Sequence, residues 1–217
     1  MKIIIVGGGI AACSTYLFFR QTFAQDPAKY EIKIYEKHAP RAKVSSSEDE
    51  PDSDSQDLEE LSTSTAIVGG GLGISPNGAR ILSEISQDLY DDVAAQGFPC
   101  EKFIFRASRG WKLSETPSTD GRGHCCIASS RHGLWRCLSK AVGADAIEIK
   151  KVVRVIPRAG HQCPKVLFKD GGEEVADLII GADGVKSVVK DGIFSESEYR
   201  PIYELVPLLL PSTSLIV

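Results

Sequence analysis

The sequence predicts an α/β fold in which a parallel sheet is followed by an antiparallel β-meander. Residues Lys2 to Val6 form an apolar, β-branched run with the length of a buried parallel strand, and a helix-like segment, 10–24, follows. A second β-branched run spans Glu31 to Tyr35. Three further strand-like runs lie between residues 146 and 181, and Asp170-Gly171-Gly172 joins the last two with the composition of a hairpin turn.

The turn between the first strand and the first helix has the spacing of a dinucleotide-binding loop, as in a Rossmann-like domain. Gly7 permits a sharp turn, Gly9 lets the backbone approach a phosphate, and Ala12 is small enough for the helix to pack on its strand. The helix N-terminus then faces the anion. Glycine-rich turns also join strands to helices for packing alone, so this alternative stays open.

Glu36 ends the second strand-like run, 24 residues after Ala12. A carboxylate at this position accepts hydrogen bonds from the ribose hydroxyls of an adenosine, and its charge repels a 2′-phosphate. The alternative is an exposed glutamate that pairs with its neighbour Lys37. The loop before it favours the ribose role.

Composition excludes several classes of function. The chain has 217 residues, 42% of them hydrophobic, with a net charge of -4 and a pI near 5.6, so no nucleic-acid partner is expected. The six cysteines lack metal-ligand spacing, and we expect free thiols in a reducing, cytoplasmic compartment and no metal site. No apolar run approaches the ~18 residues of a membrane span.

An acidic, serine-rich segment interrupts the chain at 44–65, with eight acidic residues from Glu48 to Glu60, and predicts a solvated, disordered insertion. A glycine run, Gly69 to Gly73, follows it. We do not expect a second nucleotide loop there, because the branched side chain of Ile74 prevents close helix packing.

One helix is predicted from Ser75, as N-cap, to Gly97, packed against the sheet. Its apolar face comprises Ile81, Leu82, Ile85, Leu89 and Val93.

Between residues 98 and 130 we expect part of a second sheet, with strands over Phe103 to Leu113 and Cys125 to Ala128 joined through a polar loop, 114–123. Arg131 then opens a helix whose apolar face is Leu134, Leu138 and Val142. An arginine is unfavourable at a helix N-terminus, which indicates a role toward an anion or ligand, although a surface arginine is the alternative.

The meander is expected over 146–157, 165–169 and 175–181. Its last strand leads into Gly181-Ala182-Asp183-Gly184 and a helix with Ser187 and Lys190. Asp183 is therefore aimed at a helix start, as a cap or toward a ligand.

Five motifs occur in the order found in one known family. They are Gly7-x-Gly9-x-x-Ala12; the strand-end Glu36; Gly69-Gly70-Gly71-Leu72-x-x-x-Pro76-Asn77-Gly78; Arg131 three residues before Leu134; and Gly181-Ala182-Asp183-Gly184-x-x-Ser187-x-x-Lys190. On these motifs the chain resembles the flavin-dependent aromatic-ring monooxygenases of the salicylate-hydroxylase-like and para-hydroxybenzoate-hydroxylase-like kind. The resemblance runs from Met1 to about Phe194, without the acidic insertion.

The resemblance implies FAD as cofactor, NAD(P)H as a transient electron donor, dioxygen, and a small aromatic substrate. It places Asp183 and Gly184 near the flavin pyrophosphate and the nicotinamide route. Arg131 then contacts FAD, and Gly70 and Gly71 stand where the family makes a backbone contact to the cofactor. Lys190 replaces the usual arginine. No catalytic residue is predicted, because the four histidines are scattered and no Ser-His-Asp constellation is visible.

The resemblance also implies a division of the chain. Residues 1–43 and 66–97 would form the Rossmann-like core, 98–130 part of a second, substrate-domain sheet, 131–194 the rest of the FAD-binding domain, and 195–217 an atypical tail. No Gly-Asp dipeptide of the family's second flavin motif occurs, so we expect a truncated form. The competing hypotheses are a non-catalytic FAD- or nucleotide-binding protein and an NAD-linked Rossmann protein. The Asp183 element and the meander argue against the second of these.

Overall fold

A four-stranded parallel sheet organises the fold, in the order β12-β1-β2-β8. The structure is a computed structural model and describes residues 1–38 and 70–194. The strands are β1 (Lys2–Val6), β2 (Glu31–Glu36), β8 (Ile147–Ile149) and β12 (Leu178–Gly181). The predicted parallel sheet is confirmed, and β1 lies at its interior with a parallel neighbour on each side.

The alternation of β1 divides the interior into two apolar clusters, one on each face of the sheet. Ile3 and Ile5 pack with the helices α1 (Ile10–Thr22) and α5 (Arg131–Val142). Ile4 and Val6 pack on the opposite face with the β-meander. The fold therefore has three layers, helices, parallel sheet and meander, because successive strand residues point to opposite faces.

The meander consists of β9 (Val152–Ile156), β10 (Lys165–Phe168) and β11 (Glu173–Val175), with α6 (Val188–Ile193) against β9. The turn at 170–172 is confirmed, with Gly171 at φ +86°. The first and last strands predicted for the meander, 146–157 and 175–181, are wrong, because each is two strands in the structure. Strands β8 and β12 belong to the parallel sheet, and only β9 and β11 belong to the meander.

Helix α1 ends at Thr22, two residues before the expected end, and the 3₁₀ turn η1 (Pro27–Lys29) follows. The buried side chains of α1 are Ala12, Cys13 and Tyr16. Phe18 on the same helix is apolar but 52% exposed.

The single helix expected over 75–97 is two helices, α3 (Pro76–Ile85) and α4 (Gln87–Gln96). The break falls at Ser86, which is extended (φ −164°, ψ 133°) and caps α4 by accepting a hydrogen bond from the backbone N–H of Leu89 at 3.5 Å. The predicted cap at Ser75 is confirmed. Ile81, within α3, is 46% exposed, which corrects the predicted apolar face, although Leu82, Leu89 and Val93 are buried as expected.

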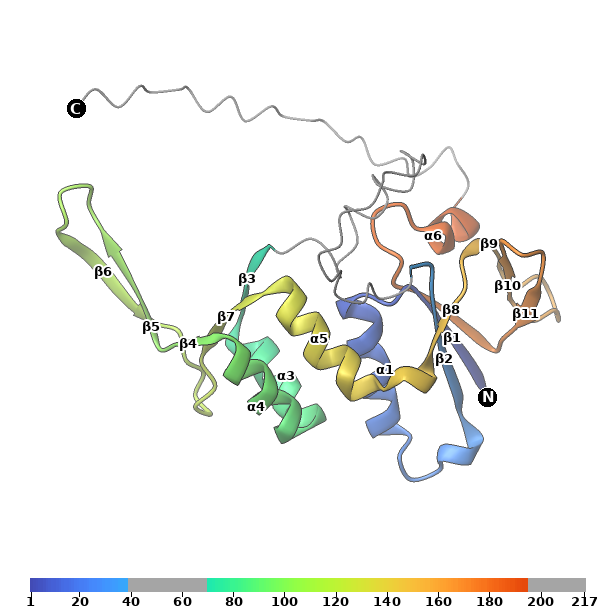
Figure 1. The fold of residues 1–217 in the computed structure, drawn as a ribbon, viewed down its shortest axis with the longest axis horizontal. Helices are drawn as coiled ribbons and strands as arrows, with labels where there is room; N and C mark the ends of the chain where they lie inside the picture. The colour runs from blue at the N-terminus through green and yellow to red at the C-terminus, as the bar shows by residue number, and fades with distance from the viewer. Residues whose placement is uncertain (39–69, 195–217) are drawn as a thin grey trace, which may run out of the picture.

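A second sheet has the antiparallel order β3-β7-β4, formed by β3 (Gly71–Ile74), β7 (Cys126–Ser130) and β4 (Phe98–Cys100). The strand expected over 103–113 is instead a hairpin of β5 (Lys102–Arg106) and β6 (Lys112–Pro117), which projects from the body of the molecule (Figure 1). Its apolar side chains are exposed, with Trp111 at 69%. The apolar face predicted for α5 is confirmed, and the 3₁₀ turn η2 (Ala144–Ala146) follows it.

The predicted acidic insertion, 44–65, and the tail, 195–217, lie outside the described residues. Across 1–38 and 70–194, no helix combines the length and the apolar character required to cross a membrane.

Candidate functional site

Gly7 makes the turn that the sequence predicts, at the point where β1 meets the loop after β12. Its φ is +102°, and its N–H donates to the carbonyl of Tyr35 at 2.8 Å. A Cβ atom at Gly7 would lie 2.5 Å from the carbonyl oxygen of Ala182 and 2.9 Å from the Cα of Asp183. The predicted loop and the predicted Asp183 element, nearly the whole chain apart, are therefore in direct contact.

Glu36 reaches back to the same loop from the end of β2. Its Oε2 accepts a hydrogen bond from Gly8 N–H, and its Oε1 accepts one from His38 N–H at 3.0 Å. A Cβ atom at Gly8 would lie 2.9 Å from the Cβ of Glu36, so this close approach requires glycine. Gly8 was not among the predicted site residues, because the motif treats it as a spacer.

The N-terminus of α1 opens beside this carboxylate. Gly9 is its N-cap, no side chain caps the helix, and its first turn contains no acidic residue. Ala12 is fully buried, as close packing of the helix requires. Backbone N–H groups at such a helix start are suited to bind an anion.

The carbonyl of Gly8 is held from two helices. Trp135 on α5 donates its indole N–H to this oxygen at 2.9 Å, and the thiol of Cys13 on α1 lies 3.7 Å from it. Burial, and secondarily the charge of Glu36, raise the pKa of the Cys13 thiol to about 11. Sequence analysis missed both residues.

Asp183 uses its carboxylate within the protein. Its Oδ1 accepts from the Ser187 hydroxyl at 2.6 Å, and its Oδ2 accepts from the N–H of Val188 at 2.7 Å. Asp183 thus binds the start of α6, as one of its two predicted roles requires, although the N-cap residue of that helix is Ser187. These bonds hold the loop with Gly184, at φ +79°, next to Gly7. Lys190 lies within α6, where its N–H donates to Ser187.

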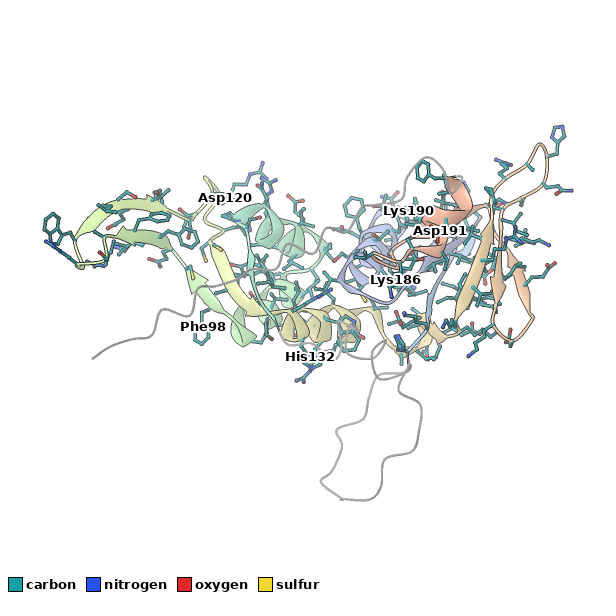
Figure 2. The ribbon with its side chains drawn as sticks, turned by 90° about the horizontal axis from the view of Figure 1, so that it is seen from above. Phe98, Asp120, His132, Lys186, Lys190 and Asp191 are labelled. Atoms are coloured by element: carbon teal, nitrogen blue, oxygen red, sulfur yellow. The ribbon has the colours of Figure 1, made fainter. Side chains whose placement is uncertain are left out.

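Gly70, Gly71 and Arg131 form a second group. Arg131 N–H donates to the carbonyl of Gly70 at 2.8 Å, and Gly71 pairs with Ser130 across β3 and β7. Helix α5 connects this group to the first, because Arg131 begins it and Trp135, four residues or about 6 Å further along, contacts Gly8. An open groove of about 580 Å³ runs beside the second group, and Phe98 lines it. Phe98, labelled in Figure 2, is 77% exposed.

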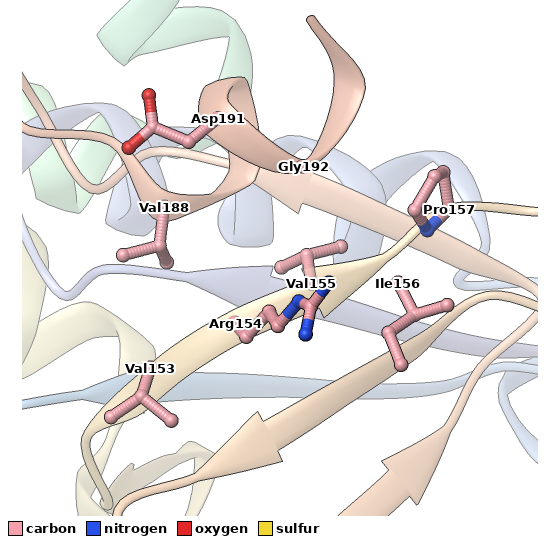
Figure 3. Close-up of a pocket in the computed structure, with 8 residues that line it drawn as sticks. All are labelled: Val153, Arg154, Val155, Ile156, Pro157, Val188, Asp191 and Gly192. Carbon is pink, nitrogen blue, oxygen red and sulfur yellow. The ribbon is translucent and has the colours of Figure 1, made fainter. Parts of the chain in front are cut away.

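A smaller hollow of about 330 Å³ lies between β9 and α6, with Arg154 and Asp191 among its lining residues (Figure 3). None of the predicted site residues lines it. It therefore does not extend the site around Gly7 and Glu36.

The sequence shows no Ser-His-Asp constellation, but the structure brings three such residues together. Ser83 Oγ lies 3.0 Å from His124 Nε2, and His124 Nδ1 lies 3.3 Å from Asp120 Oδ2. Ser83, however, donates its hydroxyl proton to the carbonyl of Arg80 at 2.9 Å, which withholds it from the imidazole. The trio fastens the connection between β6 and β7 to α3.

The groups around Gly8 fit the adenosine and pyrophosphate end of a dinucleotide. They combine a helix N-terminus without a side-chain cap, a close contact between Gly8 and Glu36 that leaves no room for a Cβ atom, and a carboxylate held at a strand end. The Nε2 atom of His38, two residues after Glu36, is buried and lacks a hydrogen-bond partner among the described residues. A polar ligand group there would satisfy it.

No family model matches the chain, but it is similar in sequence to curated monooxygenases. It is 32% identical over 154 residues to 3-amino-4-hydroxybenzoate 2-monooxygenase of Streptomyces cremeus, covering 67% of this chain and 38% of that protein. It is 30% identical over 149 residues to the FAD-dependent monooxygenase pynG of Aspergillus niger, covering 65% and 34%.

Solved structures agree on the fold. HpxO of Klebsiella pneumoniae, complexed with FAD and uric acid, superposes with a TM-score of 0.60 at 19% identity, over 88% of this chain and 41% of that one. The α/β fold with a parallel sheet and antiparallel sheets is thus confirmed. The chain is a homologue of the N-terminal portion of FAD-dependent monooxygenases, and it spans little more than a third of the length of these curated relatives.

Proposed function

We propose that this chain is the FAD-binding portion of an NAD(P)H-dependent flavin monooxygenase that hydroxylates a small aromatic substrate. The observation that carries the proposal is the contact of three separate motifs at one place. Gly8 N–H donates to Glu36, Gly7 abuts Ala182 and Asp183, and the uncapped start of α1 opens beside them. The homology to FAD-dependent monooxygenases supports FAD as the ligand rather than NAD alone.

Each residue of the site has a role that follows from its chemistry. Glu36 accepts hydrogen bonds from the ribose hydroxyls, using lone pairs that Gly8 and His38 leave available. Gly9 and the first turn of α1 present N–H groups to the pyrophosphate, and Ala12 keeps the helix close to the sheet. FAD, when bound, supplies the electron transfer from NAD(P)H and the reaction with dioxygen.

The remaining predicted residues act further along the cofactor. Asp183 and Gly184 shape the loop that bounds the pyrophosphate, and the hydrogen bonds from Ser187 and Val188 to Asp183 hold that loop against the start of α6. Arg131 places a cation at the N-terminus of α5, and Gly70 and Gly71 offer backbone groups beside it. We propose 131–194 as the continuation of the cofactor-binding core and 98–130 as part of a substrate-domain sheet.

Substrate and location are proposals of the same kind. The relatives and structural neighbours include 3-amino-4-hydroxybenzoate 2-monooxygenase and a protein complexed with uric acid, which supports a small aromatic or heteroaromatic substrate. All six cysteines are free thiols, which suits a reducing, cytoplasmic compartment.

The visible spectrum and NAD(P)H oxidation of the purified chain test this function. We expect yellow protein with tightly held FAD, and NADH or NADPH consumption that a suitable aromatic acid stimulates. Tight FAD without any turnover would favour the alternative of a non-catalytic flavin-binding protein. Colourless protein that binds NAD but no FAD would contradict both.

A further inference from the structure

The Gly7-Gly8-Gly9 backbone is held by named partners at almost every polar atom. Gly7 N–H donates to Tyr35, Gly8 N–H donates to Glu36, and the Gly9 carbonyl accepts from Cys13 N–H at 3.0 Å. Trp135 supplies the bond to the Gly8 carbonyl. Within the described part of the chain, Gly9 N–H makes no hydrogen bond.

The Gly8 carbonyl and the Gly9 N–H belong to the same peptide group. In a trans peptide these two point in opposite directions, so a carbonyl drawn toward α5 turns the Gly9 N–H away from α5. No peptide bond in the described residues is cis. Because glycine restricts backbone rotation least, a peptide between two glycines needs an external partner to keep one orientation.

We propose that Trp135 is a positioning residue for the phosphate-binding loop: its indole N–H holds the Gly8-Gly9 peptide so that the Gly9 N–H, and not the Gly8 carbonyl, faces the pyrophosphate. This inference rests on the proposed function of the site. The Cys13 thiol supports the same carbonyl more weakly, at 3.7 Å. A reversed peptide would present an oxygen to the phosphate and would remove one charge-assisted donor.

The chain contains a matched control for this role. Its two tryptophans are Trp135, whose indole N–H bonds to Gly8, and Trp111, which is 69% exposed on the β5–β6 hairpin. Phenylalanine keeps an aromatic ring at either position and removes only the indole N–H and some ring area.

Calorimetric titration of the full chain with ADP and with adenosine tests the proposal. We expect Trp135→Phe to lower the affinity for ADP about tenfold and to leave adenosine binding unchanged, because the lost donor faces the phosphates. Glu36→Gln should lower both affinities by a similar factor, since both ligands carry the ribose. Trp111→Phe should change neither.

The outcomes separate the inference from the function on which it rests. A wild-type chain that binds neither ADP nor FAD would overturn the proposed function. The role of Trp135 alone would be overturned if the wild-type chain and Glu36→Gln behave as expected but Trp135→Phe does not. In that case Trp135→Phe would bind both ligands as Trp111→Phe does, or would lose affinity for ADP and adenosine by the same factor.

A second measurement does not require the Trp135 variant to fold. The Trp111→Phe chain has a single indole N–H, which we expect to exchange slowly with solvent and to shift in a ¹⁵N spectrum on addition of ADP but not of adenosine. An indole signal that exchanges like a free tryptophan, or ignores ADP, would contradict the proposal.

Discussion

Replacement of Gly7 by alanine tests the contact between the phosphate-binding loop and the Asp183 loop. Two costs add at this position. A residue with a Cβ is strained at φ +102°, which costs about 1–3 kcal/mol, and its Cβ would lie 2.5 Å from the Ala182 carbonyl oxygen. Because that neighbour is backbone, relief requires the loop to move, which costs about 1–3 kcal/mol more.

Gly171 provides the control, because it has the first cost without the second. Its φ is +86°, and a Cβ there meets nothing within 4 Å. Urea unfolding of the two variants, followed by circular dichroism, should show that Gly7→Ala loses about 1–3 kcal/mol more stability than Gly171→Ala. Equal losses would refute the packing of Gly7 against the Ala182-Asp183 backbone.

Two further predictions concern titratable groups. Burial raises the pKa of Glu174, but hydrogen bonds from Lys2 and Tyr35 outweigh it and hold that pKa below its ordinary value. The stabilisation is therefore present above about pH 4.3, the unfolded carboxyl value, and is lost as pH falls through the lowered pKa. Glu174→Gln should cost about 1 kcal/mol at pH 7 and progressively less below pH 4 in urea titrations, and a pH-independent cost would contradict the ion pair. Burial also raises the pKa of Cys13 to about 11, so an aromatic disulfide reagent at pH 8 should label exposed Cys163 rapidly and Cys13 only on unfolding. Mass spectrometry that finds both thiols labelled at one rate would contradict the burial of Cys13.

Local sequence signals predicted the part of the site that is contiguous in the chain. The strand Lys2–Val6, the turn at Gly7 and the strand-end position of Glu36 follow from β-branched runs and glycine spacing alone. The apolar face of α5 follows from helical periodicity. In these segments the residues that determine the conformation lie within a few positions of one another.

The errors arose where distant residues decide the structure. β-branched residues lie on both sides of Lys150 and Lys151 in the run 146–157, so nothing local shows that β8 joins the parallel sheet and β9 the meander. Trp135 lies 127 residues from Gly8, and no spacing rule connects them. Ser86 looked like an ordinary helix position, because a serine that caps a second helix differs from an exposed helical serine only in backbone conformation.

Competitive titration most directly tests the central claim, that Gly7 to Ala12, Glu36 and the Asp183 loop together form the adenosine and pyrophosphate end of an FAD site. The full chain would be titrated with FAD, and bound FAD then challenged with ADP or with FMN. The residues brought together here recognise ribose, adenosine and pyrophosphate, so we predict that ADP displaces FAD and that Glu36→Gln weakens both ligands. Displacement by FMN with no effect of ADP or of the Glu36 variant would contradict the account.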